Sequence, residues 1–280
     1  MIRNYATPYE FDIELNGEFS PGGRGGTPFG AFPMQWPTPI GTSMVEIMIS
    51  DFTINSLLYW MHKRDFLSFR IGPQTPGIGQ LLTTTCDSGG DYSGAAAGGL
   101  SSLGDLADLG VCLGDIMPAV KEKYPNRTLA IVVHTAQAPS IMLSGRGGGG
   151  VQIDLVAFAD IYIEGTNIRV GTITITVMAD VALQVFGNRI VGNATLPVLR
   201  LADRDSTLGL GQDAMDNLAN LAKDMVVKAA NQQLNKGMTL SLPTSNLPVN
   251  IINPQIRILN HAIFIGSDFT IAPSALQMLS

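Results

Sequence analysis

The sequence predicts an α+β fold in which a long, highly twisted antiparallel sheet wraps around a long amphipathic helix. The first observation is that residues 173–185 alternate between apolar odd positions and mostly polar even positions without a slip. Such a strand would be roughly 43 Å long at about 3.3 Å per residue, far beyond ordinary strands. The second is that residues 212–235 lack Gly and Pro and repeat apolar side chains at three and four positions, which predicts a helix of roughly 36 Å. Because a strand that is apolar on one face must cover something of similar length, we expect the two to pack together.

Shorter elements are expected around these two. Residues 44–49 indicate an apolar strand, and Ser50 and Asp51 cap an amphipathic helix at 52–66. Gly237 is expected to end the long helix. Further expected segments are a loosely alternating strand at 9–18, a Pro- and Gly-rich connector up to residue 40, a short helix at 115–124, and strands at 129–133, 140–143, 151–163, 256–259 and 262–265.

Composition excludes two classes of protein. The 280 residues include 17 Lys and Arg against 23 Asp and Glu, and a net charge of −6 has no attraction for phosphate backbones. We therefore expect no nucleic-acid partner, and the lack of a long apolar run predicts no transmembrane segment. The mean hydropathy of +0.22 nonetheless indicates an enclosed apolar region, either a large core or a core with a cavity. Because the first residues do not resemble a signal peptide, we expect a cytosolic protein or the later part of a secreted one.

The two cysteines and two sequons favour the secreted alternative. Cys86 and Cys112 flank a Gly-, Ser- and Ala-rich segment and have no neighbouring His, which argues against zinc. They are either two buried free thiols or a disulfide that closes the segment, and we predict the disulfide. Asn126 and Asn193 each begin a glycosylation sequon. Together these features indicate an oxidising, secretory setting.

No catalytic constellation is visible. The run at 145–150 matches G-x-G-x-x-G, but an alternating strand follows it rather than a helix, so we predict a hairpin loop and no dinucleotide site. Ser144 lacks the leading Gly of a nucleophile elbow. His62, His134 and His261 are scattered, without carboxylates at metal-binding spacing. We therefore predict that the protein is not an enzyme and carries no metal and no cofactor.

An ordered set of segments resembles one protein family. These segments are Met44–Ser56, Asp115–Asn126, Asn188–Gly192 and Leu234–Gly237, with Glu14–Phe19 similar to a central-sheet strand. The family contains bactericidal/permeability-increasing protein, lipopolysaccharide-binding protein, phospholipid transfer protein and cholesteryl ester transfer protein. The resemblance covers roughly residues 8–272. No single motif among these is diagnostic, but their order is specific.

The resemblance implies half of a boomerang-shaped protein built from two similar super-roll barrels. Residues 1–40 would be the central-sheet strand and connector, and residues 41–272 the carboxy-terminal barrel. The partner would then be a missing amino-terminal barrel of the same protein. Three features depart from the family: its common disulfide lies in the absent half, residues 238–243 differ from the usual Gly-x-Pro-Leu-Pro, and residues 87–110 resemble an insertion. A net charge of −6 gives no support for endotoxin recognition.

We therefore expect a secreted glycoprotein domain that binds or transfers phospholipid or another acyl lipid, with innate defence as one role that the resemblance suggests. Burial of acyl methylenes in an apolar pocket would supply about 0.8 kcal/mol each. The candidate pocket walls are Leu57, Leu58, Met61, Ile175, Val177, Met215, Leu218 and Met225. One alternative is an interaction barrel with a filled core that docks a separate lipid-binding half onto a receptor or lipoprotein. The other is a lipase, which the missing Ser elbow disfavours.

Overall fold

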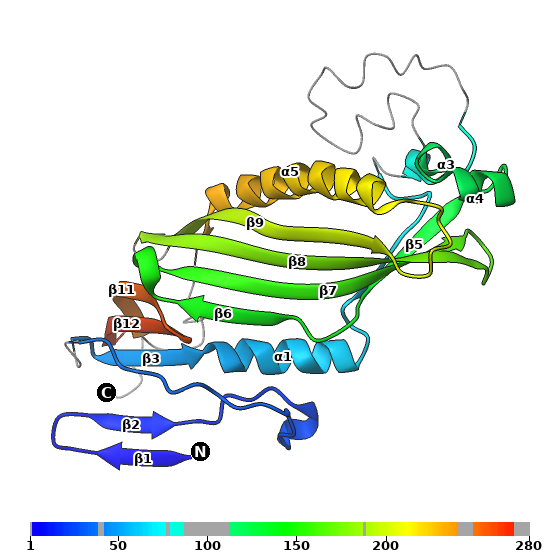
Figure 1. Ribbon diagram of the computed structural model, residues 1–280. Coiled ribbons are helices and arrows are strands. Elements are labelled where there is room, and N and C mark those ends of the chain that lie inside the picture. The colour runs from blue at the N-terminus through cyan, green and yellow to red at the C-terminus, as the bar shows by residue number, and fades with distance from the viewer. Residues whose placement is uncertain are drawn as a thin grey trace.

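The computed structural model describes residues 2–38, 42–76, 79–86, 112–186, 189–239 and 249–271. Its main layer is a curled, fully antiparallel sheet of seven strands, with the order β10–β9–β8–β7–β5–β4 and with β6 also paired to β7 (Figure 1). The strands are β4 Ser68–Ile71, β5 Leu129–Thr135, β6 Ser140–Ser144, β7 Gly150–Ile163, β8 Arg169–Phe186, β9 Arg189–Asp203 and β10 Met238–Thr239. The predicted fold class is confirmed.

The long alternating strand is present as β8, and it is flanked by two strands of similar length. β7 has 14 residues and β8 has 18, and they pair in one unbroken register from Gly150 opposite Ala182 to Ile161 opposite Gly171. β9, with 15 residues, was not predicted. Its pairing with β8 slips by one position near Pro197. A proline is tolerated in a strand at such a bulge. The bulge also interrupts the alternation of apolar and polar residues by which a strand is predicted from sequence.

The long helix is also confirmed. α5 spans Gln212–Lys236, and Gly237 ends it with φ 72°, a backbone conformation that favours glycine. The helix lies along β9, which forms an edge of the sheet except at Arg189 and Ile190, where the two-residue β10 pairs with it (Figure 1). Asn231 donates to the Ala194 carbonyl (3.0 Å) and accepts from the Ala194 N–H (2.6 Å). The partner of α5 is therefore chiefly the unpredicted strand.

The main core lies at the end of the sheet where α5 begins. Two short helices, α3 Leu113–Ile116 and α4 Pro118–Lys123, cover this end, where one helix was predicted. The buried cluster contains Leu82, Met117, Val120, Leu129, Ile161, Ile163, Val170, Leu201, Leu208, Met215 and Ala219. It joins Val120 of α4 and the neighbouring Met117 to the sheet and to the first turns of α5, and Leu113 and Ile116 of α3 pack against it.

A second, three-stranded sheet joins the beginning and the end of the chain. Its order is β11–β12–β3, with β11 Val249–Leu259, β12 Ala262–Ile271 and β3 Val45–Ser50. β3 leads directly into α1 Asp51–Lys63, and the Ser50 side chain caps that helix by accepting from the Phe52 N–H (3.1 Å). The predicted strand, cap and helix at this position are all present.

The amino-terminal segment differs from the prediction. Instead of one strand across 9–18, it forms a hairpin of β1 Arg3–Ala6 and β2 Phe11–Glu14. Residues 15–20 form no strand, which corrects the central-sheet strand expected at Glu14–Phe19. The Phe19 N–H instead donates to the Ser56 hydroxyl (2.9 Å), so this stretch packs on α1. Short 3₁₀ turns occur at Pro21–Gly23, Gly79–Leu81 and Arg146–Gly148.

Candidate functional site

The first half of α5 packs tightly on the sheet. The Met215 side chain is fully buried, and Leu218 and Ile175 pack against the same cluster. Three of the predicted pocket residues therefore lie together, on α5 and on the odd-numbered face of β8. At this end they are part of a filled core.

Further along α5 the packing opens. Met225 lies two turns after Leu218 and so on the same helix face, but it is only half-buried. On β8, Val177 and two of the later odd positions, Val181 and Leu183, are likewise half-buried and belong to no described core cluster. We call Val177, Val181, Leu183 and Met225 the open apolar face. It continues the core as apolar surface that the described residues leave partly uncovered.

The predicted residues on α1 lie elsewhere. α1 packs along β6, whereas α5 packs along β9, so the two helices cover opposite edges of the β9–β8–β7–β6 layer (Figure 1). Leu58 and Met61 are half-buried, and Leu57 is 38% exposed. None of the three belongs to the core cluster around Met215. The structure therefore does not bring the α1 residues together with those of α5.

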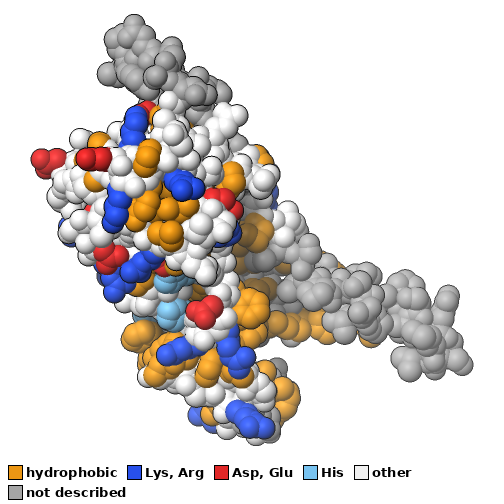
Figure 2. Space-filling model, turned by 90° about the vertical axis from the view of Figure 1, so that its right-hand side faces the viewer, with side chains coloured by type: hydrophobic (Ala, Val, Ile, Leu, Met, Phe, Trp, Pro, Cys, Tyr) orange, Lys and Arg blue, Asp and Glu red, His pale blue; other side chains and the backbone are white. Residues whose placement is uncertain are grey.

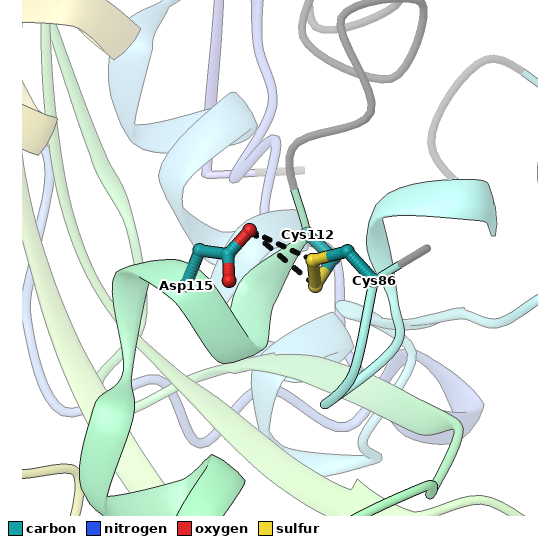
Figure 3. A group of neighbouring side chains, drawn as sticks. All are labelled: Cys86, Cys112 and Asp115. Atoms are coloured by element: carbon teal, nitrogen blue, oxygen red, sulfur yellow. Dashed lines mark hydrogen bonds between the residues drawn. A yellow bond between two sulfur atoms is a disulfide. The ribbon is translucent and has the colours of Figure 1, made fainter. Parts of the chain in front are cut away.

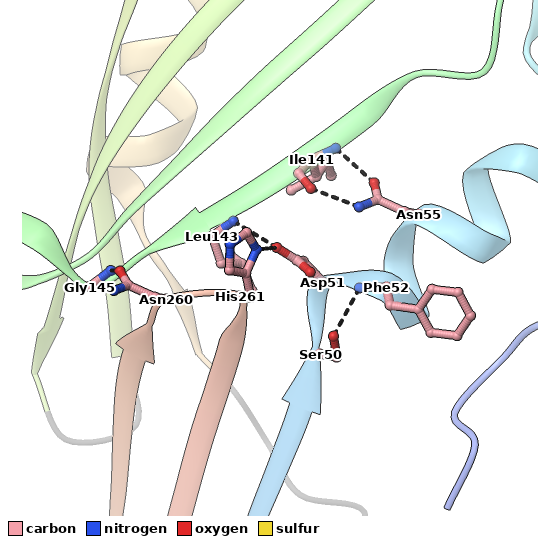
Figure 4. Close-up of polar contacts among 9 residues, drawn as sticks. All are labelled: Ser50, Asp51, Phe52, Asn55, Ile141, Leu143, Gly145, Asn260 and His261. Atoms are coloured by element: carbon pink, nitrogen blue, oxygen red, sulfur yellow. Dashed lines mark hydrogen bonds and ion pairs between the residues drawn. The ribbon is translucent and has the colours of Figure 1, made fainter. Parts of the chain in front are cut away.

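The β6 edge is sealed by polar side chains (Figure 4). Asn55 on α1 donates to the Ile141 carbonyl (2.8 Å) and accepts from the Ile141 N–H (2.7 Å). The buried Asp51 carboxylate accepts from the Leu143 N–H (3.2 Å) and pairs with His261 Nδ1 (2.9 Å). Backbone N–H and carbonyl groups at a strand edge are costly when they are buried without a partner. These contacts therefore hold α1, β6 and the second sheet together at this edge.

A polar network occupies the other face of the main sheet. Asp160 Oδ1 accepts from the Thr172 hydroxyl (2.6 Å), and Asp160 Oδ2 lies 3.1 Å from His134 Nε2. Burial raises the pKa of the Asp160 carboxyl, and these two hydrogen bonds lower it. The positive charges of His134 and Arg169 act in the same direction, so the pKa lies below its ordinary value. Sequence reasoning missed this network because its members are far apart in the chain.

The surface around this network is mixed in character. Figure 2 shows histidine side chains among apolar, basic and acidic ones on the face at the α3–α4 end. Arg204 lies over the Phe158 ring at 4.2 Å, and Arg169 also pairs with Asp205 (3.5 Å). These cations therefore have partners, and the face shown is not a continuous basic patch.

The predicted disulfide is present in the structure. Cys86 and Cys112 are bonded, with their Cα atoms 5.8 Å apart (Figure 3). Asp115 Oδ2 lies 2.8 Å from Cys86 Sγ, so these three residues have the spacing of a metal site. Sulfurs in a disulfide are not thiolates, and thiolate is the form that binds metal. The Gly-rich segment 87–110 and the departure at 240–243 lie outside the described residues.

Several smaller predictions have a structural outcome. The G-x-G-x-x-G run is the turn between β6 and β7, as predicted for a hairpin loop. Asn126 and Asn193 are both exposed, which leaves their glycosylation a prediction. Within the described residues, no helix combines the length and apolar character needed to cross a membrane.

Comparison with known proteins identifies the family. Residues 2–271 match the LBP / BPI / CETP family, C-terminal domain. This chain belongs to that family. Its members are lipid-binding and lipid-transfer proteins rather than enzymes, and they are typically secreted. Among curated proteins, no sequence matches the chain.

A solved structure is also similar to the chain. The crystal structure of lipopolysaccharide binding protein matches with a TM-score of 0.44 and 14% identity. The match covers 86% of this chain and 46% of that one, so the chain spans about half the length of this relative. The family assignment depends on the family match alone.

Proposed function

We propose that this domain binds phospholipid acyl chains against the open apolar face between α5 and β8. The observation that carries the proposal is the change along α5. Met215 is fully buried, whereas Met225, ten residues later on the same helix, is half-buried, and so are the later odd positions Val177, Val181 and Leu183 of β8. An acyl chain laid there would remove this surface from water, at about 25 cal/mol per Å².

The α1 residues have a secondary place in this proposal. Leu58 and Met61 lie at the β6 edge, away from α5, so they would contact lipid only if an acyl chain crossed the sheet. Ile175, Met215 and Leu218 would form the closed end of the site, because they pack in or against the core. Val177 and Met225 are the predicted residues that we expect to contact lipid first.

We also propose that the domain acts outside the cell, without catalysis, as part of a two-barrel protein. The disulfide and the two exposed sequon asparagines support the extracellular setting. The β3 side chains Val45, Ile47 and Ile49 are exposed and apolar, and an amino-terminal barrel would cover them. A role in innate defence is the biological setting that we propose from the family.

An interaction barrel with a filled core is the rival proposal. The fully buried Met215 favours it at one end of α5. Lipid mass spectrometry of the purified chain separates the two proposals. Phospholipid at near-stoichiometric amounts is the expected result, and a lipid-free protein that takes up no added phospholipid would refute the lipid site.

A second experiment locates the site on α5. Met225→Trp should block the open apolar face and lower bound phospholipid several-fold while the melting temperature changes little. Asn220→Trp adds the same bulk at an exposed position of the same helix and should leave bound lipid unchanged. If Met225→Trp instead overpacks a solid core, it should destabilise the fold by about 1–3 kcal/mol. If Met225→Trp destabilises the fold and the amount of bound phospholipid stays unchanged, the lipid site does not lie at α5.

A further inference from the structure

A depression of about 590 Å³ lies at the opposite end of the sheet from the disulfide, between three segments. Its walls are five connector residues between 33 and 38, Gly145 and Arg146 in the β6–β7 turn, and residues 258–260 at the β11–β12 turn. None of these residues belongs to α5 or β8. The depression is therefore separate from the open apolar face, and its volume suits a small ligand or headgroup.

The walls are held in place by specific contacts. The Phe32 ring stacks on the His261 ring at 4.2 Å, and Trp36 meets Phe264 edge to face at 6.3 Å. These contacts fix the connector on the second sheet. They place Trp36, whose indole N–H is a hydrogen-bond donor, on one wall of the depression.

The β6–β7 turn is fixed from the other side. The Gly145 N–H donates to Asn260 Oδ1 (2.9 Å), as Figure 4 shows. Gly149 has φ 128°, and a Cβ there would lie 2.7 Å from the Ile258 Cβ, so only glycine allows the turn to approach β11 this closely. Arg146 therefore lies in an anchored turn.

The chemistry of the walls is that of an anion site. Five lining side chains carry hydrogen-bond donors, namely Arg146, Trp36, Gln35, Thr38 and Asn260, and none of the lining residues is acidic. Because Asn260 Oδ1 already accepts from Gly145, its amide nitrogen is the end left for a ligand. Arg146 forms no ion pair with any described residue. A lone guanidinium among neutral donors, in a protein of net charge −6, favours an oxyanion.

We propose that this depression, the Arg146 pocket, binds a phosphate group, with Arg146 as the charged ligand and the Trp36 indole and Asn260 amide as neutral donors. The phosphate can come from a phospholipid headgroup or from a soluble phosphate. This site is additional to the acyl-chain site proposed above, since the two share no residue.

The two tryptophans allow a direct test by nuclear magnetic resonance. The indole N–H signal of Trp36 should move saturably when the full chain is titrated with inorganic phosphate or with dihexanoyl phosphatidic acid below its micelle concentration. Dihexanoylglycerol, which has the acyl chains but no phosphate, should leave the signal in place. The buried indole of Trp60 is an internal control that should not move.

Variants assign the effect to the pocket. Arg146→Ala should weaken phosphate binding at least about tenfold, in line with a charge-assisted hydrogen bond, and Arg146→Lys should restore part of it. Arg200→Ala removes an exposed arginine outside the pocket and should bind as wild type does. Arg146 lies in an exposed turn, so unchanged melting curves are expected for all three.

Each outcome decides the proposal. If the Trp36 signal moves with phosphatidic acid but not with inorganic phosphate, and Arg146→Ala abolishes this movement, the ligand is a lipid headgroup. If inorganic phosphate moves the signal equally, the ligand is a soluble phosphate. An unmoved Trp36 signal, an equal response to dihexanoylglycerol, or unchanged affinity in Arg146→Ala would overturn the site. The amount of phospholipid that co-purifies with Arg146→Ala tests the acyl-chain site at α5 independently. The acyl-chain proposal therefore does not depend on whether the Arg146 pocket binds phosphate.

Discussion

The two edges of the main sheet are closed by the same device but with different results. At each edge a helix presents an asparagine amide to one strand residue and satisfies both its N–H and its carbonyl: Asn55 with Ile141 on β6, and Asn231 with Ala194 on β9. An amide side chain can in this way replace a missing neighbour strand. At the β6 edge the buried Asp51 adds contacts to Leu143 and to a second sheet. The β9 edge is joined to α5 by two more hydrogen bonds, from Gln212 to the Leu201 carbonyl (3.1 Å) and from Arg189 to the Lys236 carbonyl (2.7 Å), but its helix covers a filled core only at one end.

This difference is why we propose the α5 side of the domain, and not the β6 edge, as the lipid-binding wall. The β6 edge is tied to α1 and to the β11–β12 turn by several hydrogen bonds, so opening it would expose buried polar groups. The second half of α5 is tied to β9 by Asn231 and by Arg189, which donates to the Lys236 carbonyl (2.7 Å). The half-buried Met225 lies between the filled core, which reaches Ala219, and these two ties. Separating helix and strand there would break fewer hydrogen bonds.

The largest expected effect compares the two ends of α5. Met215→Ala should lower the free energy of unfolding by about 2–5 kcal/mol, because it leaves a cavity in a filled core. Met225→Ala should cost less than half of that, because its side chain is already half-exposed. Urea denaturation of both variants measures the difference. Equal losses would mean that α5 is packed uniformly and that its second half has no open face.

The disulfide should support the filled end. Cys112 immediately precedes α3, and the core cluster contains Met117, which joins α3 to α4, and Val120 of α4. Replacing both cysteines by serine should lower the free energy of unfolding by about 3–4 kcal/mol in the chain-entropy model for a loop of this length. Denaturation without reductant measures it. Two alkylatable thiols in native, unreduced protein would contradict the bridge itself.

The asparagine ties test the two edges directly. Asn55→Ala and Asn231→Ala should each lower the free energy of unfolding by about 1–3 kcal/mol, because each leaves a strand N–H and a strand carbonyl without a hydrogen-bond partner. Hydrogen exchange should differ between them: the second half of α5 should exchange faster in Asn231→Ala, whereas α1 should stay protected in Asn55→Ala because Asp51 still holds it. Gln232→Ala, an exposed neighbour of Asn231, is the matched control. Similar exchange changes at both edges would remove the distinction between them.

The smallest expected effect lies between the two edges, at Asp160. Its pKa is lowered in the folded protein, so its contribution to stability is present above the unfolded value near 4 and is lost as pH falls through the folded pKa. Asp160→Asn should therefore lower the free energy of unfolding by about 1 kcal/mol at pH 7. The difference in this free energy between variant and wild type should disappear as pH falls below about 4. Stability curves from pH 7 to 3 test this. A gap that persists at low pH would show a packing effect and not an electrostatic one.

The sequence predicted the elements whose pattern is local. The unbroken period of β8, the Gly- and Pro-free run of α5 and the Ser50 cap each need only neighbouring residues, and all three are present. β9 was missed because Pro197 and a bulge interrupt its period. For the candidate site, the apolar stripe on α5 was predicted, but its division into a filled and an open part was not, because that depends on which other segments reach it.

The sequence by itself therefore determined the fold class, the family and the pairing of Cys86 with Cys112, because periodicity, ordered segments and a single pair of cysteines are properties of the chain read in order. Tertiary structure decided that α1 and α5 cover opposite edges, that Asp51 meets His261, and that Arg146 and Trp36 line the same depression. Asp51 and His261 are 210 positions apart. Contacts between distant residues follow from the curl of the sheet and the packing of the connector, and no local pattern records either of them.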